Sequence, residues 1–285
     1  MVNFNLDQDI PDLSGKVLLV TGGNNGLGKE TRPDSSPRPS TPLRTFRGLS
    51  PTRHPSHYDL ASFDSIKKAV VGFHAQPDRL DLLINNAGIC AQPPSTTQDG
   101  YEIHFGTNHL GHALLTKLLL PALLKTAAAS SAEAWAPFLD PADFDTLRTN
   151  MAPRSGFSRY SLSQVANVLH AHALAVRHPA LRSVALHPGV VNTNIASGVA
   201  ASWPVLAPLV RFVRLFGDVL QTPVAAGVGT QLWAGVSPEA ESGEFYFPVG
   251  VAGEASMHAR DRRMEEALWA WTERELERYL DAAKT

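Results

Sequence analysis

The sequence predicts a doubly wound α/β domain built on a parallel β-sheet. Three short apolar runs carry this prediction, because a turn that contains glycine follows each of them at once. The runs and their turns are residues 16–28, 81–88 and 183–189. Segments with helical periodicity separate the runs, and strands that alternate with helices are typical of βαβ units. A chain of 285 residues is long enough to form one domain over 1–285.

The predicted elements follow one another in a regular order. Residues 16–20 are expected to form the first strand, with a helix opening after Gly28, and residues 81–84 the next recognisable strand. Residues 109–124 have apolar positions on most faces, which predicts a helix covered on both sides. Apolar side chains recur near a 3.6-residue period in 161–176, which predicts a second helix. Residues 183–186 are expected to form a further strand and the charged stretch 256–283 a terminal helix.

One segment does not fit this alternation. Residues 31–57 contain six prolines among scattered arginine and serine, without helical or strand periodicity. Proline breaks helices and removes a donor from a strand ladder, so we expect an irregular loop here.

Composition and charge exclude several classes of function. The formal net charge is −2 with both signs mixed along the chain, which gives no basis for a nucleic-acid partner and leaves a small-molecule substrate as the expectation. Cys90 is the only cysteine, so an intrachain disulfide and a cysteine-based zinc site are excluded. Residues 1–16 lack the features of a secretory signal, and prolines and charges interrupt the apolar stretch 203–220. We therefore expect a cytoplasmic protein with no transmembrane span.

The glycine-rich turn at 21–28 is the first candidate binding site. Gly22, Gly26 and Gly28 stand where the chain passes from strand to helix and where the backbone must approach a pyrophosphate closely. Backbone amides and the positive end of the helix would face the phosphates. The spacing differs from G-x-G-x-x-G, so on this motif alone a structural turn without a ligand stays open as an alternative.

Further motifs support the ligand. In chain order they are TGGNNGLG at 21–28, DL at 59–60, NNAG at 85–88, FGTNHLGH at 105–112, YSLSQ at 160–164 and HPGVVNT at 187–193. With this order and spacing the chain resembles the short-chain dehydrogenases/reductases, and within them the retinol dehydrogenase-like and fungal members. Only 31–57 and about 126–129 lie outside the resemblance. It implies a Rossmann-like fold and an NAD(P)-dependent oxidoreductase that interconverts an alcohol and a carbonyl.

The resemblance also implies roles at the cofactor. At the pyrophosphate the expected residues are Gly22, Gly26, Leu27 and Gly28, and at the adenine edge the expected residue is Asp59. At the adenosine ribose they are Asn86, Ala87 and Gly88, and at the nicotinamide they are Val191 and Thr193. Lys117 matches a position that contacts the cofactor in relatives, with a solvated helix lysine as the alternative.

The catalytic set implied by the resemblance is an asparagine, a serine, a tyrosine and a lysine four residues after the tyrosine. Asn108 and Tyr160 match it. Ser131 is preferred over Ser130 because Ala-Glu-Ala-Trp-Ala-Pro follows it, and two ordinary polar residues are the alternative. The tyrosine hydroxyl would exchange a proton with the substrate oxygen while hydride moves to or from the nicotinamide.

Gln164 stands where the resemblance implies the lysine. A free tyrosine has a pKa of about 10, and a neighbouring ammonium lowers it. Glutamine donates a hydrogen bond but carries no charge. The alternative function is therefore a catalytically impaired member of the family that binds nucleotide or a protein partner without turnover.

Two segments depart from the architecture that the resemblance implies. Residues 31–57 offer neither the helix nor the strand that follows the glycine turn in relatives, so the choice between NAD and NADP is unreadable and NADP is a family-level expectation. Residues 125–129 are too few and too small for a central buried strand before Ser131. We expect the sheet to lack one or two strands of the full fold, with nothing rigid to position Ser131.

The remaining expectations concern substrate, metal and assembly. Residues 194–235 are apolar where relatives have their substrate loop, which predicts an apolar alcohol or ketone. His104, His109 and His112 lie close in sequence, but no carboxylate or cysteine cluster accompanies them, so no metal is expected. A homo-oligomer is possible.

Overall fold

The computed structural model describes residues 4–6, 8–23, 26–31, 58–75, 79–126, 129–133, 144–189, 224–253 and 261–282. Within them lies a five-stranded sheet with the strand order β1-β2-β3-β4-β5. The strands are β1 (Leu18–Val20), β2 (Leu82–Ile84), β3 (Ala129–Glu133), β4 (Arg182–Leu186) and β5 (Phe245–Tyr246). Every neighbouring pair is parallel, which confirms the predicted α/β class. The reversal of a doubly wound sheet would lie beyond β1, outside the described residues.

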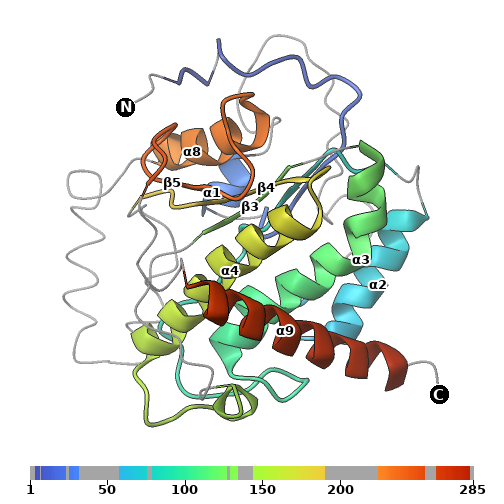
Figure 1. The fold of residues 1–285 in the computed structure, drawn as a ribbon, viewed down its shortest axis with the longest axis vertical. Coiled ribbons are helices and arrows are strands. Elements are labelled where there is room, and N and C mark those ends of the chain that lie inside the picture. The colour runs from blue at the N-terminus through green and yellow to red at the C-terminus, as the bar shows by residue number, and fades with distance from the viewer. Residues whose placement is uncertain are drawn as a thin grey trace.

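Helices cover both faces of the sheet (Figure 1). One face carries α2 (Phe63–His74), the π-helix η1 (Phe105–Leu110), α3 (Gly111–Thr126), α4 (Gly156–Arg177) and α9 (Arg262–Ala282). The other face carries α1 (Gly26–Glu30) and α8 (Val224–Val236), and a short 3₁₀ helix, η3 (Thr146–Arg148), precedes α4. Side chains of β4 alternate between the two layers: Val184 packs with Trp233 of α8, and Ala185 packs with Val168 of α4.

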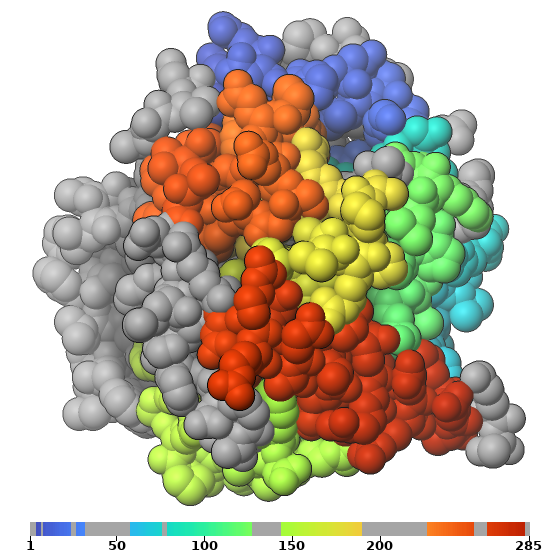
Figure 2. Space-filling model, in the orientation of Figure 1, coloured from blue at the N-terminus to red at the C-terminus, as the bar shows by residue number. Residues whose placement is uncertain are grey.

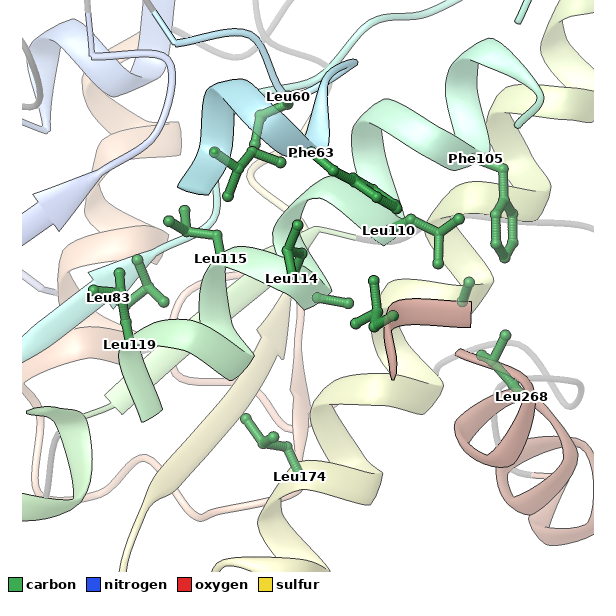
Figure 3. Packing of buried hydrophobic residues seen from close by; sticks show 14 of the residues in the cluster. Leu60, Phe63, Leu83, Phe105, Leu110, Leu114, Leu115, Leu119, Leu174 and Leu268 are labelled. Atoms are coloured by element: carbon green, nitrogen blue, oxygen red, sulfur yellow. The ribbon is translucent and has the colours of Figure 1, made fainter. Parts of the chain in front are cut away.

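The largest apolar cluster joins β2, α2, α3, α4 and α9. Figure 3 shows leucines of α3 converging with Leu83 of β2, Leu174 of α4 and Leu268 of α9. These side chains are almost fully buried, with exposed fractions of 0 to 4%. Helix α3 is therefore apolar on most of its faces because other elements enclose it, as its sequence predicts.

The terminal helix docks through its aromatic residues. Trp271 is 4% exposed, and its ring lies 5.9 Å from Phe105 and 5.6 Å from Phe144. Trp269 stacks on His170 of α4 at 5.0 Å. Figure 2 shows α9, in red, lying against the yellow-green part of the surface that includes α4. The terminal helix is thus an integral part of the α3/α4 layer.

The expectation that no strand precedes Ser131 was wrong. Residues Ala129–Glu133 form β3 at the centre of the sheet, where Ser131 pairs with Ile84 of β2 and Val184 of β4. A strand ladder is made by backbone groups, so small side chains can form it. Without β3 the facing backbone groups of β2 and β4 would be buried unpaired. The second segment that we expected to lack a strand, 31–57, lies outside the described residues except for Thr31.

Among the described residues no helix combines the length and the apolar character that a bilayer crossing requires.

Candidate active site

The glycine turn packs directly against the segment that follows β2. Gly22 has a φ of +67°, in the left-handed region that favours glycine, and a Cβ there would lie 3.1 Å from the Cα of Ala87. A Cβ on Gly28 would lie 2.5 Å from the carbonyl oxygen of Gly22 and closer still to the side chain of Asn86. Only glycine at 22 and 28 lets the two segments approach in this way.

We expect Gly28→Ala to destabilise the fold by about 1–3 kcal/mol, because the added methyl group meets backbone that cannot move aside. Nucleotide binding is expected to weaken with it. Urea unfolding and a nucleotide titration would measure both effects. Gly72→Ala in α2 is the matched control: its Cβ would meet nothing within 4 Å, so it should stabilise by about 0.5–1 kcal/mol. Equal effects at the two sites would contradict the close packing at Gly28.

Thr21 and Asn86 hold this junction together. The Thr21 Oγ1 accepts hydrogen bonds from the backbone nitrogens of Asn86, at 2.9 Å, and Ala87, at 2.8 Å. The Asn86 Nδ2 donates to the Thr21 carbonyl at 2.9 Å, and its Oδ1 accepts from Gln231 Nε2 at 2.9 Å. Thr31 donates to Gln231 Oε1 at 2.6 Å. Both polar groups of the Asn86 side chain thus brace the turn, a role that sequence motifs alone did not indicate.

Asn108 lies in η1 and joins the loop after β2 to α4. Its side chain is 1% exposed. Nδ2 donates to the carbonyl of Ile89 and to Ser163 Oγ, both at 3.0 Å, and Oδ1 accepts from Ile89 N at 2.9 Å. Ser163 donates in turn to the carbonyl of Tyr160 at 2.6 Å. Asn108 therefore sets the distance between Gly88–Ile89 and the helix turn that carries Tyr160; π-helical turns are frequent at such functional positions.

His112 connects Asn108 with the glycine turn. Its Nδ1 lies 2.8 Å from the Asn108 carbonyl oxygen, and its Nε2 lies 2.9 Å from Thr21 Oγ1. A carbonyl oxygen only accepts, so Nδ1 carries the hydrogen and Nε2 accepts from the threonine hydroxyl. Burial lowers the pKa of His112 to about 4, so the ring is neutral at pH 7. Thr21 is thereby linked, through His112 and the backbone and side chain of Asn108, to the turn of Tyr160.

Tyr160 lies near the start of α4, which Ser155 caps by accepting a hydrogen bond from Ser158 N at 3.1 Å. The Gln164 Nε2 donates to the phenol Oη at 3.0 Å. Gln164 is 6% exposed. The residue that replaces the expected lysine therefore touches the phenol itself, as a neutral donor.

Glu102, His104 and Arg159 form a buried polar network beside Tyr160, which sequence reasoning missed. Arg159 and Glu102 are each 1% exposed, and Arg159 Nη1 lies 2.9 Å from Glu102 Oε1. The same oxygen lies 2.8 Å from His104 Nδ1, and the His104 ring meets the Tyr160 ring edge-on at 6.5 Å. Arg159 also donates to the carbonyl of Gln92 at 2.7 Å. The available signal was an arginine directly before the tyrosine.

The other predicted cofactor residues are placed as follows. Gly26 begins α1, and the side chain of Leu27 packs against Val228 and Leu232 of α8. Asp59 is exposed at the turn before α2, where its Oδ1 accepts from Ala61 N at 2.9 Å. Val191 and Thr193 lie outside the described residues.

Lys117 and Ser131 are not brought to the phenol by any described contact. The Lys117 ammonium pairs with Glu273 of α9, and both side chains are partly buried. Ser131 is held within β3, two residues before the strand ends at Glu133, so the expectation that nothing rigid positions its backbone was wrong. Its side chain lies outside the described part of the chain.

The histidines of η1 and α3 are engaged by protein groups. His109 Nδ1 lies 3.2 Å from Asn167 Oδ1, and its Nε2 lies 3.1 Å from Thr272 Oγ1. Across the ranges described above, no three His, Cys, Asp or Glu side chains are grouped so as to hold a metal ion.

Comparison with known proteins identifies the family. Residues 36–131 match the family model described as short chain dehydrogenase. The match runs through 36–57 and 126–129, which we had expected to lie outside the resemblance. The chain is 32% identical to a short-chain dehydrogenase/reductase of Armillaria gallica over 95% of this chain and 93% of that protein. It is also 32% identical to human retinol dehydrogenase 12, over 90% and 85% of the two chains.

A solved structure has the same fold. It is a 3-ketoacyl-(acyl-carrier-protein) reductase from Brucella melitensis complexed with NADH, with a TM-score of 0.55 and 19% identity over 82% of this chain and 96% of that one. The chain therefore belongs to the short-chain dehydrogenase/reductase family of oxidoreductases, and retinol dehydrogenase-like proteins are among its relatives.

Proposed function

We propose that this protein is an NAD(P)-dependent oxidoreductase that interconverts an alcohol and a carbonyl on a small apolar substrate, with Tyr160 as the acid/base. The observation that carries the proposal is the set of hydrogen bonds that links Thr21, through His112, the backbone and side chain of Asn108, and Ser163, to the backbone carbonyl of Tyr160. It ties the glycine turn to the helix of the phenol at the carboxyl ends of β1 and β2. This edge of an open parallel sheet is where such folds bind ligands.

The residues present fit a dinucleotide at its pyrophosphate end. The turn at Gly22 exposes its backbone while its inner side is packed against Ala87. Gly22, Gly26, Leu27 and Gly28 would hold the pyrophosphate, Asp59 the adenine edge, Asn86, Ala87 and Gly88 the adenosine ribose, and Val191 and Thr193 the nicotinamide. When bound, the cofactor supplies or accepts the hydride. NADP is the proposed form of the cofactor on family grounds. NAD is the alternative, because the Brucella melitensis reductase was solved as a complex with NADH.

The chain itself moves the proton. The Tyr160 hydroxyl would donate to the substrate oxygen during carbonyl reduction and accept from it during alcohol oxidation. Asn108 would act by fixing the loop at Gly88 relative to α4, and Ser131 would hold the substrate oxygen. The name of the human relative, retinol dehydrogenase 12, supports an apolar alcohol as the substrate class.

Titration of the purified protein with NADPH and NADH, followed by nicotinamide fluorescence, tests the proposal. We expect binding and slow reduction of retinaldehyde or a long-chain aldehyde, with Tyr160→Phe retaining binding and losing turnover. Binding without turnover would favour the alternative of a catalytically impaired member of the family. Failure of both nucleotides to bind would refute the proposed enzyme and would leave, of the alternative, only a protein that acts through a protein partner.

We expect Gln164→Lys to raise kcat, because an ammonium beside the phenol favours the tyrosinate by charge. A phenol pKa lower by two, which corresponds to about 2.7 kcal/mol, would raise the tyrosinate fraction at neutral pH about a hundredfold. Burial of the new ammonium opposes part of this gain, so we expect kcat to rise about tenfold or more. Gln164→Met, which keeps the length and removes the donor, is the control and should lower kcat. An equal or lower kcat in the lysine variant would contradict the argument.

A further inference from the structure

We propose that Thr272, His109, Asn167 and Gln164 form a chain of hydrogen bonds whose donors all point toward Tyr160 Oη, so that the terminal helix α9 helps to stabilise the ionised phenol. The catalytic meaning of this chain rests on the function proposed above. The existence of the chain and the direction of its hydrogen bonds do not rest on that function.

The contacts of the chain connect three elements. On α4, Gln164 Nε2 donates to Tyr160 Oη at 3.0 Å, and Asn167 Nδ2 donates to Gln164 Oε1 at 3.2 Å. His109 of η1 then joins Asn167 Oδ1 to Thr272 Oγ1 of α9, at 3.2 and 3.1 Å. Tyr160, Gln164 and Asn167 are spaced i, i+4 and i+7, which places them on one face of the helix.

Each member of the chain transmits the direction of the hydrogen bonds. A side-chain amide has one donor end and one acceptor end, so Gln164 can donate to the phenol only with its oxygen turned to Asn167. Asn167 then presents its own oxygen to the imidazole, which requires the hydrogen of His109 on Nδ1. His109 Nε2 is left with a lone pair, which accepts from the Thr272 hydroxyl. One tautomer of His109 therefore accompanies one direction of the whole chain.

Burial makes this direction matter. Thr272 is 0% exposed, His109 1% and Gln164 6%. Burial and, next, the charge of His170 lower the pKa of His109 well below its usual value, so its ring is neutral at pH 7 and carries a single hydrogen. In a medium of low dielectric constant, aligned hydrogen bonds polarise one another, and donors that converge on a phenol oxygen favour its ionised form.

The other titratable groups in this part of the structure make contacts of their own. At the ring edge, His104 and Arg159 both contact the carboxylate of Glu102. Behind the chain, His170 stacks on Trp269, and His112 is hydrogen-bonded to Asn108 and Thr21. Gln164 donates directly to the phenol oxygen, so the chain is a route by which α9 influences Tyr160.

The tautomer of His109 in the unaltered protein tests the direction of the hydrogen bonds. Long-range ¹H–¹⁵N correlation spectra of the uniformly labelled protein distinguish a hydrogen on Nδ1 from one on Nε2, and His109→Gln assigns the signal. We expect His109 to carry its hydrogen on Nδ1. His112, whose Nδ1 must donate to the Asn108 carbonyl, is the internal reference for that tautomer. A hydrogen on Nε2 of His109 would mean the reverse direction, with the phenol as donor, and would overturn the proposal.

The ionisation of Tyr160 tests the effect. The pH at which its phenol ionises can be followed by ¹³Cζ-tyrosine NMR, with Tyr160→Phe to assign the signal. Asn167→Asp offers only acceptors, which should turn the Gln164 amide so that its oxygen faces the phenol; we expect ionisation to move up by about one pH unit or more. Thr272→Val should move it in the same direction by less. Thr116→Val in α3 is the control: Thr116 is 2% exposed and outside the hydrogen-bond chain, so this variant should leave the ionisation pH of Tyr160 unchanged.

No step of these experiments needs cofactor or turnover. A higher ionisation pH in Asn167→Asp and Thr272→Val together with failure to bind either NADPH or NADH would support the chain and refute the proposed function. Normal turnover with an unchanged ionisation pH in both variants would support the proposed function and refute the chain. If a variant does not fold, the tautomer of His109 in the unaltered protein still decides.

Discussion

Acidification from pH 7 to pH 4.5 is expected to remove several kcal/mol from the free energy of unfolding, because two fully buried histidines must remain neutral in the folded state. Burial lowers the pKa of His112 to about 4, against a weaker opposing effect of its hydrogen bond to the Asn108 carbonyl. Burial lowers the pKa of His109 further, and the charge of His170 adds to this. Neither ring can take up a proton without losing an acceptor function at Nε2.

The sign follows from proton binding in the two states. An unfolded histidine has a pKa of about 6.5, so between pH 6.5 and pH 4 the unfolded chain binds protons that the folded chain refuses. The stability is therefore fully present above pH 6.5 and is lost as the pH falls below it. Each such histidine contributes a slope of about 1.4 kcal/mol per pH unit, so His112 alone accounts for about 3 kcal/mol over the window. His109 should contribute at least as much.

Urea unfolding at pH 7, 6, 5 and 4.5 measures this slope. We expect His112→Gln to reduce it by about 1.4 kcal/mol per pH unit, whatever its effect at pH 7. His74→Gln, at an exposed position near the end of α2, is the matched control and should leave the slope unchanged. Burial lowers the pKa of His170 to about 4, but the residue is partly exposed. His170 should therefore contribute less to the slope than His109 or His112. A slope that is identical in the protein and in His112→Gln would show that His112 is not held neutral.

The fold was predictable where local patterns and burial agree. The apolar runs before the glycine and asparagine turns became β1, β2 and β4, and the predicted helices became η1 with α3, α4 and α9. Strand β3 was not predictable in this way. Its residues, Ala-Ser-Ser-Ala-Glu, have no apolar signal, and the strand forms because β2 and β4 offer backbone partners on both sides.

The candidate site divides along the same line. Motifs pointed to the glycine turn, Asn108 and Tyr160, because each is a short segment with its own chemistry. The motifs could not point to the residues that hold the candidate site in place. Gln231 reaches Asn86 across 145 positions of sequence, and Thr272 reaches His109 across 163. Such contacts exist only after the helices have packed, so no local pattern contains them.

The buried network beside Tyr160 leads to the second large effect: Glu102→Gln is expected to destabilise the protein by about 3–5 kcal/mol. The substitution keeps the shape of the side chain but leaves the guanidinium of Arg159, which is 1% exposed, without a counter-charge. Burial raises the pKa of Glu102, yet hydrogen bonds from His104 and from Phe105 N outweigh burial and lower it overall, so the carboxylate is ionised at pH 7. Its removal therefore takes away a full charge.

A double-mutant cycle separates this charge effect from lost packing. Arg159→Met should cost less than Glu102→Gln, because the carboxylate keeps its hydrogen bond from His104 at 2.8 Å. The double variant should be more stable than the sum of the single changes implies, since neither charge is then left alone. Glu266→Gln, which breaks an ion pair with Arg177 at a position 68% exposed, is the control and should cost less than about 1 kcal/mol. Additive costs in the cycle would mean that Arg159 and Glu102 act independently.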